Sequence, residues 1–328
     1  MRILFIGGTG NLSTACAAQL RAQGHEILVL TRGQRPVPEG FQALRADRRD
    51  PASVAAALQG QKLDAALDFI AFEPADAQMD FELLKNRIEQ FVFISTTVVY
   101  ERPARFLPMT EAHPQGNAYS DYGVKKQACE AWLMDQHRRT GFPITIVRPS
   151  HTYSQSWIPG VVTSTDYGFA ARLEQGKPVF VPGDGETPWT LTAASDFAVG
   201  LAGLLGNPGA IGEAVQITGD EVLTWNQIYA EIASALGVAH PDIVQVPVDF
   251  ICERHPLMVA KLKGDKSAPG LFDNAKIKTL VPSFATRIPF REGIRQSVAW
   301  FRDHPEARSI NAQFDAIHED VVQAWRTR

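Results

Sequence analysis

The stretch ILFIGGTGNLSTACAAQLRAQGHEILVLTRG, residues 3–33, decides the fold of this chain. It begins with an apolar run, turns through glycines, continues with small and apolar residues at helical spacing, and enters a second apolar run after Gly24. An apolar run predicts a buried strand, and a glycine after a periodic segment marks the end of a helix. The stretch therefore predicts a strand–helix–strand unit whose two strands run parallel.

The same alternation of strand and helix continues to Pro149. Helical spacing recurs in residues 51–61 and 76–88, and short apolar runs occupy residues 63–72, 90–99 and 144–149. Such alternation is typical of a parallel sheet with helices on both faces, the doubly wound α/β class. After Pro149 glycine- and proline-rich loops become frequent. We therefore expect a first domain over residues 1–150, to which later segments return, and a smaller region over residues 151–328.

The composition excludes several classes of protein. With 45% hydrophobic and 21% charged residues, the 328-residue chain has the composition of a globular protein. The formal charge of −4 and the isoelectric point near 6.1 provide no basic field for nucleic acid or anionic lipid. Three widely spaced cysteines suit neither a disulfide framework nor a zinc site, so we expect a cytoplasmic location and no metal. No apolar run reaches the roughly 20 residues of a membrane span.

Gly7, Gly10 and Ser13 have the spacing of a dinucleotide-binding turn, directly after a strand and at the start of a helix. Gly7 would permit the tight turn, and Gly10 would let the backbone approach a pyrophosphate. The first helical residues, Asn11 and Leu12, would offer free N–H groups and the positive end of the helix dipole. Ser13 replaces the third glycine but is small enough for close packing of the helix on the strand. The alternative is a glycine turn that binds no ligand.

The end of the second strand indicates which dinucleotide is bound. NAD-selective sites usually carry Asp or Glu there to bind the ribose 2′-hydroxyl, whereas this strand ends in Thr31 and Arg32. Arg32, helped by Arg35, would pair with a 2′-phosphate, so we favour NADP over NAD as the cofactor. A solvated loop arginine is the alternative for Arg32. Asp47 either accepts a hydrogen bond from the adenine amino group or serves as a helix cap or a surface carboxylate.

A candidate catalytic pair, Tyr122 and Lys126, lies in SDYGVKKQACEAWL, residues 120–133, where a spacing of four places both side chains on one helix face. A phenol titrates at about pH 10, but a neighbouring ammonium and the positive nicotinamide of an oxidised cofactor favour the phenolate. Lys126 would also bind the ribose hydroxyls. Thr96, at the end of the preceding strand, would hydrogen-bond the reacting oxygen of the substrate. The alternatives are a surface Tyr–Lys pair and a threonine that merely suits a strand.

These motifs together resemble the extended short-chain dehydrogenases/reductases of the NAD-dependent epimerase/dehydratase group. The resemblance covers nearly the whole chain and is carried by GGTGNLS at residues 7–13, STTVVY at 95–100, YGVKK at 122–126, VRPSHTY at 147–153, DNAKIKTLVPSF at 273–284 and PFREGIRQSVAWF at 289–301. It implies a Rossmann-type doubly wound parallel sheet with a smaller, mainly C-terminal substrate-binding region. It also implies that Thr96 is the hydroxyl member, Tyr122 the acid/base and Lys126 its partner in a Thr–Tyr–Lys mechanism.

The chain departs from the group's pattern at several substrate positions. Dehydratases of the group usually carry an acidic pair after the threonine, whereas Thr97 and Val98 stand here. Trp189 occupies the position of an arginine that is usual in members that bind nucleotide sugars. His151 stands where relatives often have an asparagine that touches the substrate, and a structural loop histidine is the alternative. The candidates for the substrate wall are Thr97, His151 and Trp189, with Trp157 and Tyr167; core packing is the alternative for either tryptophan.

The sequence thus predicts an NAD(P)-dependent dehydrogenase, reductase or epimerase that transfers hydride to or from a small polar substrate, a sugar or nucleotide sugar. More distantly, GKPVFVPGDG at residues 176–185 and EAVQITGDEVLTW at 213–225 resemble the chloroplast stem-loop binding proteins, which are associated with RNA. Two alternatives follow: an RNA-binding protein on a dinucleotide-binding fold, and a regulator that binds cofactor without turnover. The acidic balance disfavours nucleic acid as a partner. Dimers are common in the resembled group, so a homodimer is a further expectation.

Overall fold

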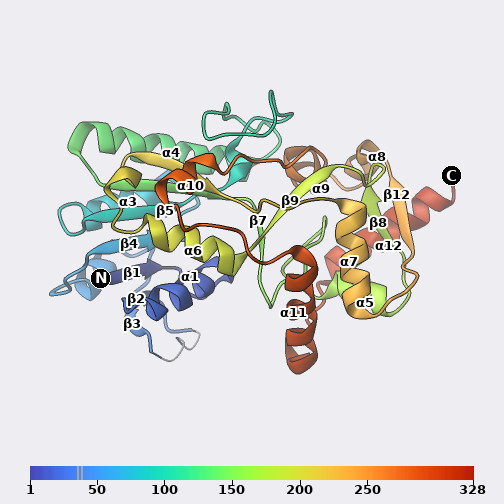
Figure 1. Cartoon of the computed structure of the whole chain (residues 1–328), viewed down its shortest axis with the longest axis horizontal. Coiled ribbons are helices and arrows are strands. Elements are labelled where there is room, and N and C mark those ends of the chain that lie inside the picture. Colours follow the sequence, from blue (N-terminus) through green and yellow to red (C-terminus); the bar gives the residue numbers. More distant parts are fainter. Residues whose placement is uncertain (35–36, 38–39) are drawn as a thin grey trace.

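A computed structural model describes residues 1–34, 37 and 40–328. Within these residues seven strands form one parallel sheet in the order β3-β2-β1-β4-β5-β6-β10 (Figure 1). The strands are β1 (Arg2–Ile6), β2 (Glu26–Thr31), β3 (Gln42–Arg45), β4 (Ala65–Asp68), β5 (Gln90–Ile94), β6 (Ile144–Pro149) and β10 (Glu213–Ile217). The strand order reverses between β1 and β4, and open α/β sheets bind ligands at such a reversal.

The opening residues fold as the sequence predicts. β1 and β2 pair in parallel and are joined by α1 (Asn11–Ala22). Gly7 turns the chain out of β1 with a φ of 85°, in the left-handed region that side chains rarely adopt. Gly24, with a φ of 83°, separates the end of α1 from β2. The predicted strand–helix–strand unit is therefore present.

Helices cover both faces of the sheet (Figure 1). On one face α1, α6 (Ala194–Leu204) and α10 (Ala275–Leu280) pack on Ile3, Phe5 and the strand residues beside them. On the other face α2 (Pro51–Ala57), α3 (Pro74–Leu84) and α4 (Asp121–Thr140) pack on Leu4, Ile6 and their neighbours. Successive strand residues point to opposite faces, so continuous apolar strands bury both sets of side chains. The predicted doubly wound α/β fold is confirmed.

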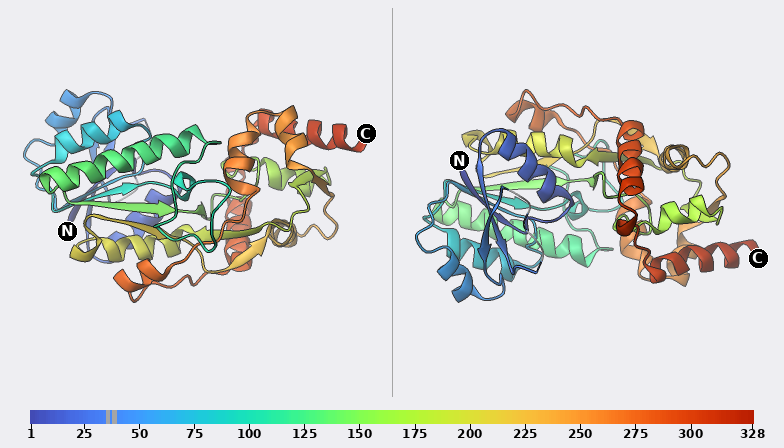
Figure 2. Two further views of the ribbon diagram at one scale, coloured as in Figure 1. Left: turned by 90° about the horizontal axis from the view of Figure 1, so that it is seen from above. Right: turned by 90° about the horizontal axis from the view of Figure 1, so that it is seen from below.

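The chain after β6 builds a smaller body beside this sheet (Figure 2). It contains a three-stranded sheet of β7 (His151–Tyr153), β9 (Pro188–Ala193) and β11 (Val222–Thr224), and a parallel pair of β8 (Val179–Pro182) and β12 (Ile243–Val246). The helices of this body are α5 (Gly168–Glu174), α7 (Trp225–Leu236), α8 (Val248–Arg254), α9 (Met258–Lys261), α11 (Phe290–Asp303) and α12 (Ala312–Arg326). Together they enclose an apolar core of their own.

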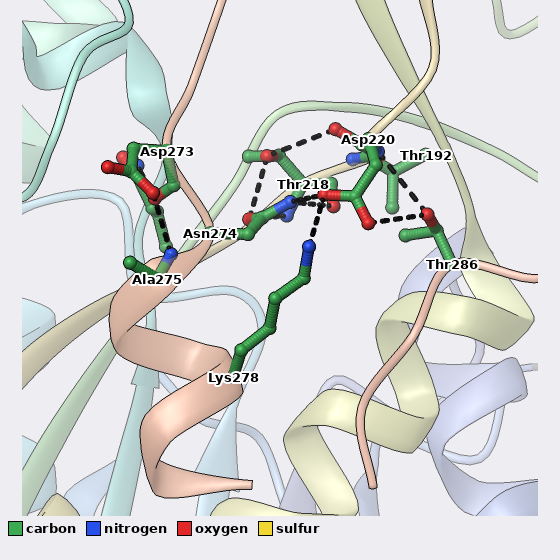
Figure 3. A network of polar contacts seen from close by, with 10 residues as sticks. Thr192, Thr218, Asp220, Asp273, Asn274, Ala275, Lys278 and Thr286 are labelled. Atoms are coloured by element: carbon green, nitrogen blue, oxygen red, sulfur yellow. Dashed lines mark hydrogen bonds and ion pairs between the residues drawn. The ribbon is translucent and has the colours of Figure 1, made fainter. Parts of the chain in front are cut away.

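Later segments of the chain lie in the first sheet. β10 pairs with β6 at the sheet edge, and α6 packs on α1. Polar contacts close this joint: Asn274 accepts hydrogen bonds from the N–H and hydroxyl groups of Thr218 and donates to its carbonyl oxygen (Figure 3). Asn274 also donates to Asp220, and Gly219 donates its N–H to the Thr192 hydroxyl of β9. The joint therefore connects β9 and β10 with the segment that begins α10.

Within residues 1–34, 37 and 40–328, no helix combines the length and apolar character that crossing a membrane requires. In the same residues no group of three or more His, Cys, Asp or Glu side chains is arranged to hold a metal ion. Cys16, Cys129 and Cys252 are buried free thiols.

Candidate active site

A cavity of about 490 Å³ opens at the carboxyl ends of β1, β4, β5 and β6. The sheet order reverses at this place, so the cavity occupies the ligand-binding position of a doubly wound sheet. Its walls bring together residues from the glycine turn, from the start of α1, from the end of β5 and from α4. The predicted site residues that line it are Gly7, Gly10, Asn11, Leu12, Thr96, Tyr122 and Lys126.

The glycine turn shapes one wall of the cavity. A Cβ on Gly7 would stand 2.5 Å from Cγ2 of Ile70, so the turn has no room for a side chain. Gly10 is the N-cap of α1 and brings no side chain to it, and its own N–H donates to the Ser13 hydroxyl over 2.8 Å. Ser13 is buried, as close packing of α1 on the sheet requires. The cavity is therefore bordered by the positive end of a helix dipole, which suits an anion such as a pyrophosphate.

Helix α4 brings the catalytic candidates to the opposite wall. Ser120 caps the helix, and Tyr122 and Lys126 follow one turn apart. Thr96, which stands after β5 and begins the short 3-10 helix Thr97–Val99, lies beside the Tyr122 hydroxyl in the cavity. The three residues that the sequence predicts for catalysis therefore lie together in one cavity.

The Lys126 ammonium is buried beside the end of β5. Its Nζ donates to the carbonyl oxygen of Ile94 over 2.7 Å, and it lies 4.7 Å from the ring centre of Phe93 and 6.0 Å from that of Tyr122. Burial lowers the pKa of Lys126 to about 8, although the carboxylate of Asp68 favours the charged form. The side chain is therefore charged at neutral pH by a small margin only.

The Tyr122 side chain lines the cavity and is 42% exposed. Desolvation of the phenol raises its pKa to about 12, while the neighbouring Thr96 hydroxyl favours the phenolate. The protein by itself consequently keeps the phenol protonated at neutral pH. The positive charge of an oxidised nicotinamide, which the sequence argument includes, would be needed to make Tyr122 a base.

A second cavity, of about 670 Å³, adjoins the first. Asn11 and Trp157 border both cavities, and Asn11 donates from Nδ2 to the carbonyl oxygen of Thr152 over 3.3 Å. Oδ1 of Asn11 and the hydroxyl of Ser95 are buried without a partner. Buried polar atoms usually have partners, so these two fit a polar ligand in the first cavity. With the space that Gly7 leaves, the residues present suit a dinucleotide at the glycine turn.

The residues predicted to contact the adenosine end of a cofactor lie apart from the cavity linings. Arg32 is exposed directly after β2. Asp47 is exposed after β3, and its carboxylate accepts the N–H of Arg49 over 2.9 Å. Arg35 lies outside the described residues.

Arg45 is a basic neighbour of Arg32 that was not predicted from the sequence. In the parallel pairing of β2 and β3, Arg45 stands opposite Thr31. Its guanidinium lies beside the turn after β2, with Nε 3.5 Å from the point where a Cβ on Gly33 would stand. The signal that could have revealed it is the register of β3, since parallel strands that end together bring their last residues to one edge of the sheet.

The predicted substrate residues are distributed over the 3-10 helix and the smaller body. Trp157 borders both cavities, whereas Thr97, Trp189 and Tyr167 are buried. The Tyr167 hydroxyl donates to Glu174 over 3.0 Å. The indole of Trp189 packs in the core of the smaller body and keeps Nε1 buried without a partner.

His151 points away from the first cavity. Its neighbour Thr152 lines that cavity, and successive strand residues point to opposite sides. The imidazole lies 6.5 Å from the ring of Trp189, and its Nε2 is hydrogen-bonded to the Ser164 hydroxyl over 3.0 Å. Burial lowers the pKa of His151 well below its usual value, and Nδ1 is buried without a partner. A neutral imidazole with one free nitrogen suits a hydrogen bond to a polar ligand.

The segment after β4 forms part of the cavity wall, which the sequence argument also missed. Ile70 and Phe72 line the cavity, and the Phe72 ring lies 5.0 Å from Nζ of Lys126. These apolar side chains are 36% and 47% exposed, respectively. The apolar run of residues 63–72 is longer than β4, which ends at Asp68. Apolar residues beyond the end of a strand were the available signal.

Comparison with known proteins agrees with this geometry. The sequence profile of the NAD dependent epimerase/dehydratase family matches residues 3–218. The chain is 28% identical over 290 residues to the 2′-dehydrokanamycin reductase of Streptomyces kanamyceticus, a match that covers 88% of this chain and 81% of the reductase. It is 26% identical over 265 residues to the chloroplast stem-loop binding protein of 41 kDa b of Arabidopsis thaliana, covering 76% of this chain and 67% of that protein.

The fold is similar to that of the UDP-glucose 4-epimerase from Bifidobacterium longum, which was solved in complex with NAD+ and UDP. The TM-score is 0.76 at 17% sequence identity, over 94% of this chain and 100% of that one. The family match extends from β1 to the end of β10 and includes the glycine turn, Thr96, Tyr122 and Lys126. The resemblance predicted from the motifs is thereby confirmed: the chain belongs to the NAD dependent epimerase/dehydratase family and is an enzyme that uses a nicotinamide cofactor.

Proposed function

We propose that this protein transfers hydride between a nicotinamide cofactor and a carbon that bears a hydroxyl or carbonyl group on a sugar or sugar-like polar substrate, as an oxidoreductase or an epimerase. One observation carries the proposal. The hydroxyls of Tyr122 and Thr96 share a cavity with the Lys126 ammonium and the glycine turn. Hydride transfer at such a carbon requires a proton donor or acceptor, and these groups supply it beside a dinucleotide site.

The glycine turn and the start of α1 would hold the cofactor's pyrophosphate. Gly7 leaves the space, Gly10 allows close approach of the backbone, and Asn11 and Leu12 offer N–H groups. Lys126 would bind the ribose hydroxyls next to the nicotinamide. When bound, the nicotinamide accepts or supplies the hydride.

The residues that would contact the adenosine end of the cofactor support a preference for NADP over NAD. Arg32 and Arg45 stand at the ends of neighbouring strands, where their guanidinium groups would pair with a 2′-phosphate. An acid that would bind a free 2′-hydroxyl is absent from the end of β2, which reads LTRG. Asp47 would accept a hydrogen bond from the adenine amino group.

Tyr122 would carry the proton in both directions. In oxidation Oη of the phenolate takes the proton of the substrate hydroxyl, while the Thr96 hydroxyl hydrogen-bonds the same oxygen. In reduction Oη donates the proton to the carbonyl oxygen. The positive charge of Lys126 favours the phenolate in either case. Epimerisation would combine the two directions, with the oxidised substrate reduced again on its other face.

The substrate class rests on the relatives and on polar groups near the site. One relative is named as a reductase of 2′-dehydrokanamycin, and the similar fold is that of a UDP-glucose 4-epimerase. Trp157 would form a wall for the substrate, and Thr97 adjoins Thr96. His151 and Trp189, which the sequence predicts for the same wall, line neither of the two cavities. Cofactor that stays bound through purification would favour an epimerase, and free exchange a reductase.

Binding of nucleic acid is not part of this proposal, although one relative is named for stem-loop binding. The formal charge is −4, and the Thr–Tyr–Lys set is intact, which a stem-loop binding role does not need. A stem-loop RNA provides the test, because phosphate contacts weaken steeply as salt rises. Tight, salt-sensitive binding of RNA would contradict this exclusion.

Tyr122→Phe tests the proposed function, because it removes Oη alone. With a substrate found by screening sugars and nucleotide sugars for oxidation or reduction of the nicotinamide, we expect turnover to fall about a hundredfold to ten-thousandfold. Binding of the cofactor should stay near that of the wild type. Tyr119→Phe, at an exposed tyrosine just before α4, should leave turnover unchanged. Wild-type turnover by Tyr122→Phe would overturn the mechanism.

A further inference from the structure

A wholly buried carboxylate, Asp68, lies at the end of β4 beneath the cavity wall. Its Oδ1 accepts the N–H groups of Ile70 and Ala71 over 2.6 and 2.7 Å. Its Oδ2 forms an ion pair with Nη1 of Arg48 at 2.5 Å. The carboxylate therefore fixes the first residues of the segment that lines the cavity, and is itself fixed by a guanidinium.

Helix α3 completes the surroundings of Arg48. The guanidinium donates to Asp80 over 2.9 Å and lies 3.6 Å from Asp76. Burial and the neighbouring Asp68 raise the pKa of Asp80 well above its usual value. Arg48 therefore joins the carboxylate at the end of β4 to helix α3.

The same carboxylate acts on Lys126. In the parallel pairing of β4 and β5, Asp68 stands opposite Phe93, whose ring centre lies 4.7 Å from Nζ of Lys126. Of the charges that favour the ammonium, Asp68 has the largest effect, ahead of Glu130 of α4 itself. The positive charge of Arg48 acts against it, and the phenol ring of Tyr122 faces it from the preceding turn.

We propose that Asp68, clamped by Arg48, is a positioning residue that keeps the Lys126 ammonium charged and holds the segment 69–72 against it. The inference rests on the proposed role of Lys126 and deepens it. Burial among the rings of Phe72 and Phe93 disfavours the charge that Lys126 needs to bind ribose and favour a phenolate. The buried carboxylate at the end of the adjacent strand offsets the free-energy cost of burying the Lys126 ammonium. Asp68 also accepts the N–H groups of Ile70 and Ala71. One side chain therefore both favours the charged form of Lys126 and fixes the segment that forms the cavity wall.

The experiment measures the titration of Lys126 itself, in the protein without substrate. Reaction with acetic anhydride, quantified at residue 126 by mass spectrometry over a pH series, reports the fraction of free amine. We expect a midpoint at about pH 8 in the wild type. Asp68→Asn keeps an acceptor for the two N–H groups but removes the charge, so its midpoint should fall by about one pH unit or more. The pH above which turnover declines should likewise be lower in Asp68→Asn than in the wild type.

Asp76→Asn is the matched control, because Asp76 also contacts Arg48 but is not among the leading charges at Lys126. The titration midpoint of Lys126 in Asp76→Asn should equal that of the wild type. Asp68→Glu keeps the negative charge, so its midpoint should lie close to that of the wild type. If Asp68→Asn does not fold, Asp68→Ser removes the same charge and takes its place. An unchanged midpoint in a folded variant without the charge overturns this inference. The proposed function fails separately, through wild-type turnover by Tyr122→Phe.

Discussion

The carbonyl oxygen of Val98 lies 2.6 Å from the point where a Cβ on Gly123 would stand. Helix α4 consequently rests directly on the 3-10 helix that follows β5. Tyr122 precedes Gly123 in α4 and Thr96 begins the 3-10 helix, so we expect the geometry of the catalytic pair to depend on a residue that has no side chain. The φ of Gly123 is not positive, and the requirement for glycine is therefore one of space and not of backbone conformation.

Gly123→Ala should separate α4 from the 3-10 helix and impair catalysis. Since backbone atoms on both sides must move, we expect turnover to fall by about tenfold or more, as misplacements of this size do in active sites. Steady-state kinetics with the substrate used for Tyr122→Phe would measure the effect. Val124→Ala, on an exposed side chain of the same helix, is the control and should leave turnover intact. Equal turnover in both variants would show that the close contact does not position Tyr122.

Arg32 and Arg45 should determine the preference for NADP. Loss of a charge-assisted contact to phosphate costs about 1.5–3 kcal/mol, so each change to alanine should raise the Kd for NADP by about tenfold or more. Binding of NAD, which has no 2′-phosphate, should change little. Titration of both cofactors by fluorescence or calorimetry would give the ratio of their Kd values, with Arg49→Ala as an exposed control from the following segment. An unchanged ratio in both variants contradicts the assignment.

The sequence was sufficient for the part of the fold and site that depends on local patterns. The strand–helix–strand opening follows from Gly7, Gly24 and two apolar runs, and it is present in the structure. Tyr122 and Lys126 are four residues apart in one helix, so their common face needs no knowledge of the rest of the chain. Thr96 could be placed beside them because it ends a strand of a parallel sheet.

The remaining features depend on contacts between distant segments. Arg45 meets the turn after β2 only through the register of β3. The Asp68–Arg48 pair joins the last residue of β4 to a residue just after β3, and β1 and β2 lie between these two strands. The direction of His151 could not be predicted either, because the sequence does not show that β7 turns Thr152, and not His151, toward the cavity. The high pKa of Tyr122 follows from desolvation of the phenol, which no spacing along the chain reveals.

His318 should make the fold sensitive to acid. It lies buried in α12, where Nδ1 accepts the N–H of Phe180, and burial lowers its pKa from 6.5 to about 3. The neutral form is the one that the folded state accommodates, so this contribution to stability is complete above pH 6.5 and is lost as the pH falls toward 3. Within that window the free energy of unfolding should fall by about 1.4 kcal/mol per pH unit through this group.

His318→Gln removes this titration and should make the free energy of unfolding less dependent on pH. Urea unfolding at pH 7 and pH 5, followed by circular dichroism, measures the difference for the variant and the wild type. His240→Gln, at an exposed histidine, is the matched control and should behave as the wild type does. Should wild type and His318→Gln lose the same free energy between these pH values, another group governs the acid response.

Asn274 should be more important for stability than the ion pair beside it in the same network (Figure 3). Asn274→Ala leaves the buried N–H and carbonyl groups of Thr218 without their partners, and each unsatisfied buried group costs about 1–3 kcal/mol. Lys278→Ala removes only a half-exposed ion pair with Asp220, which contributes about 0–1 kcal/mol. We therefore expect a clearly lower urea midpoint for Asn274→Ala and a small change for Lys278→Ala. Equal midpoints would mean that water replaces Asn274 at the joint between β10 and α10.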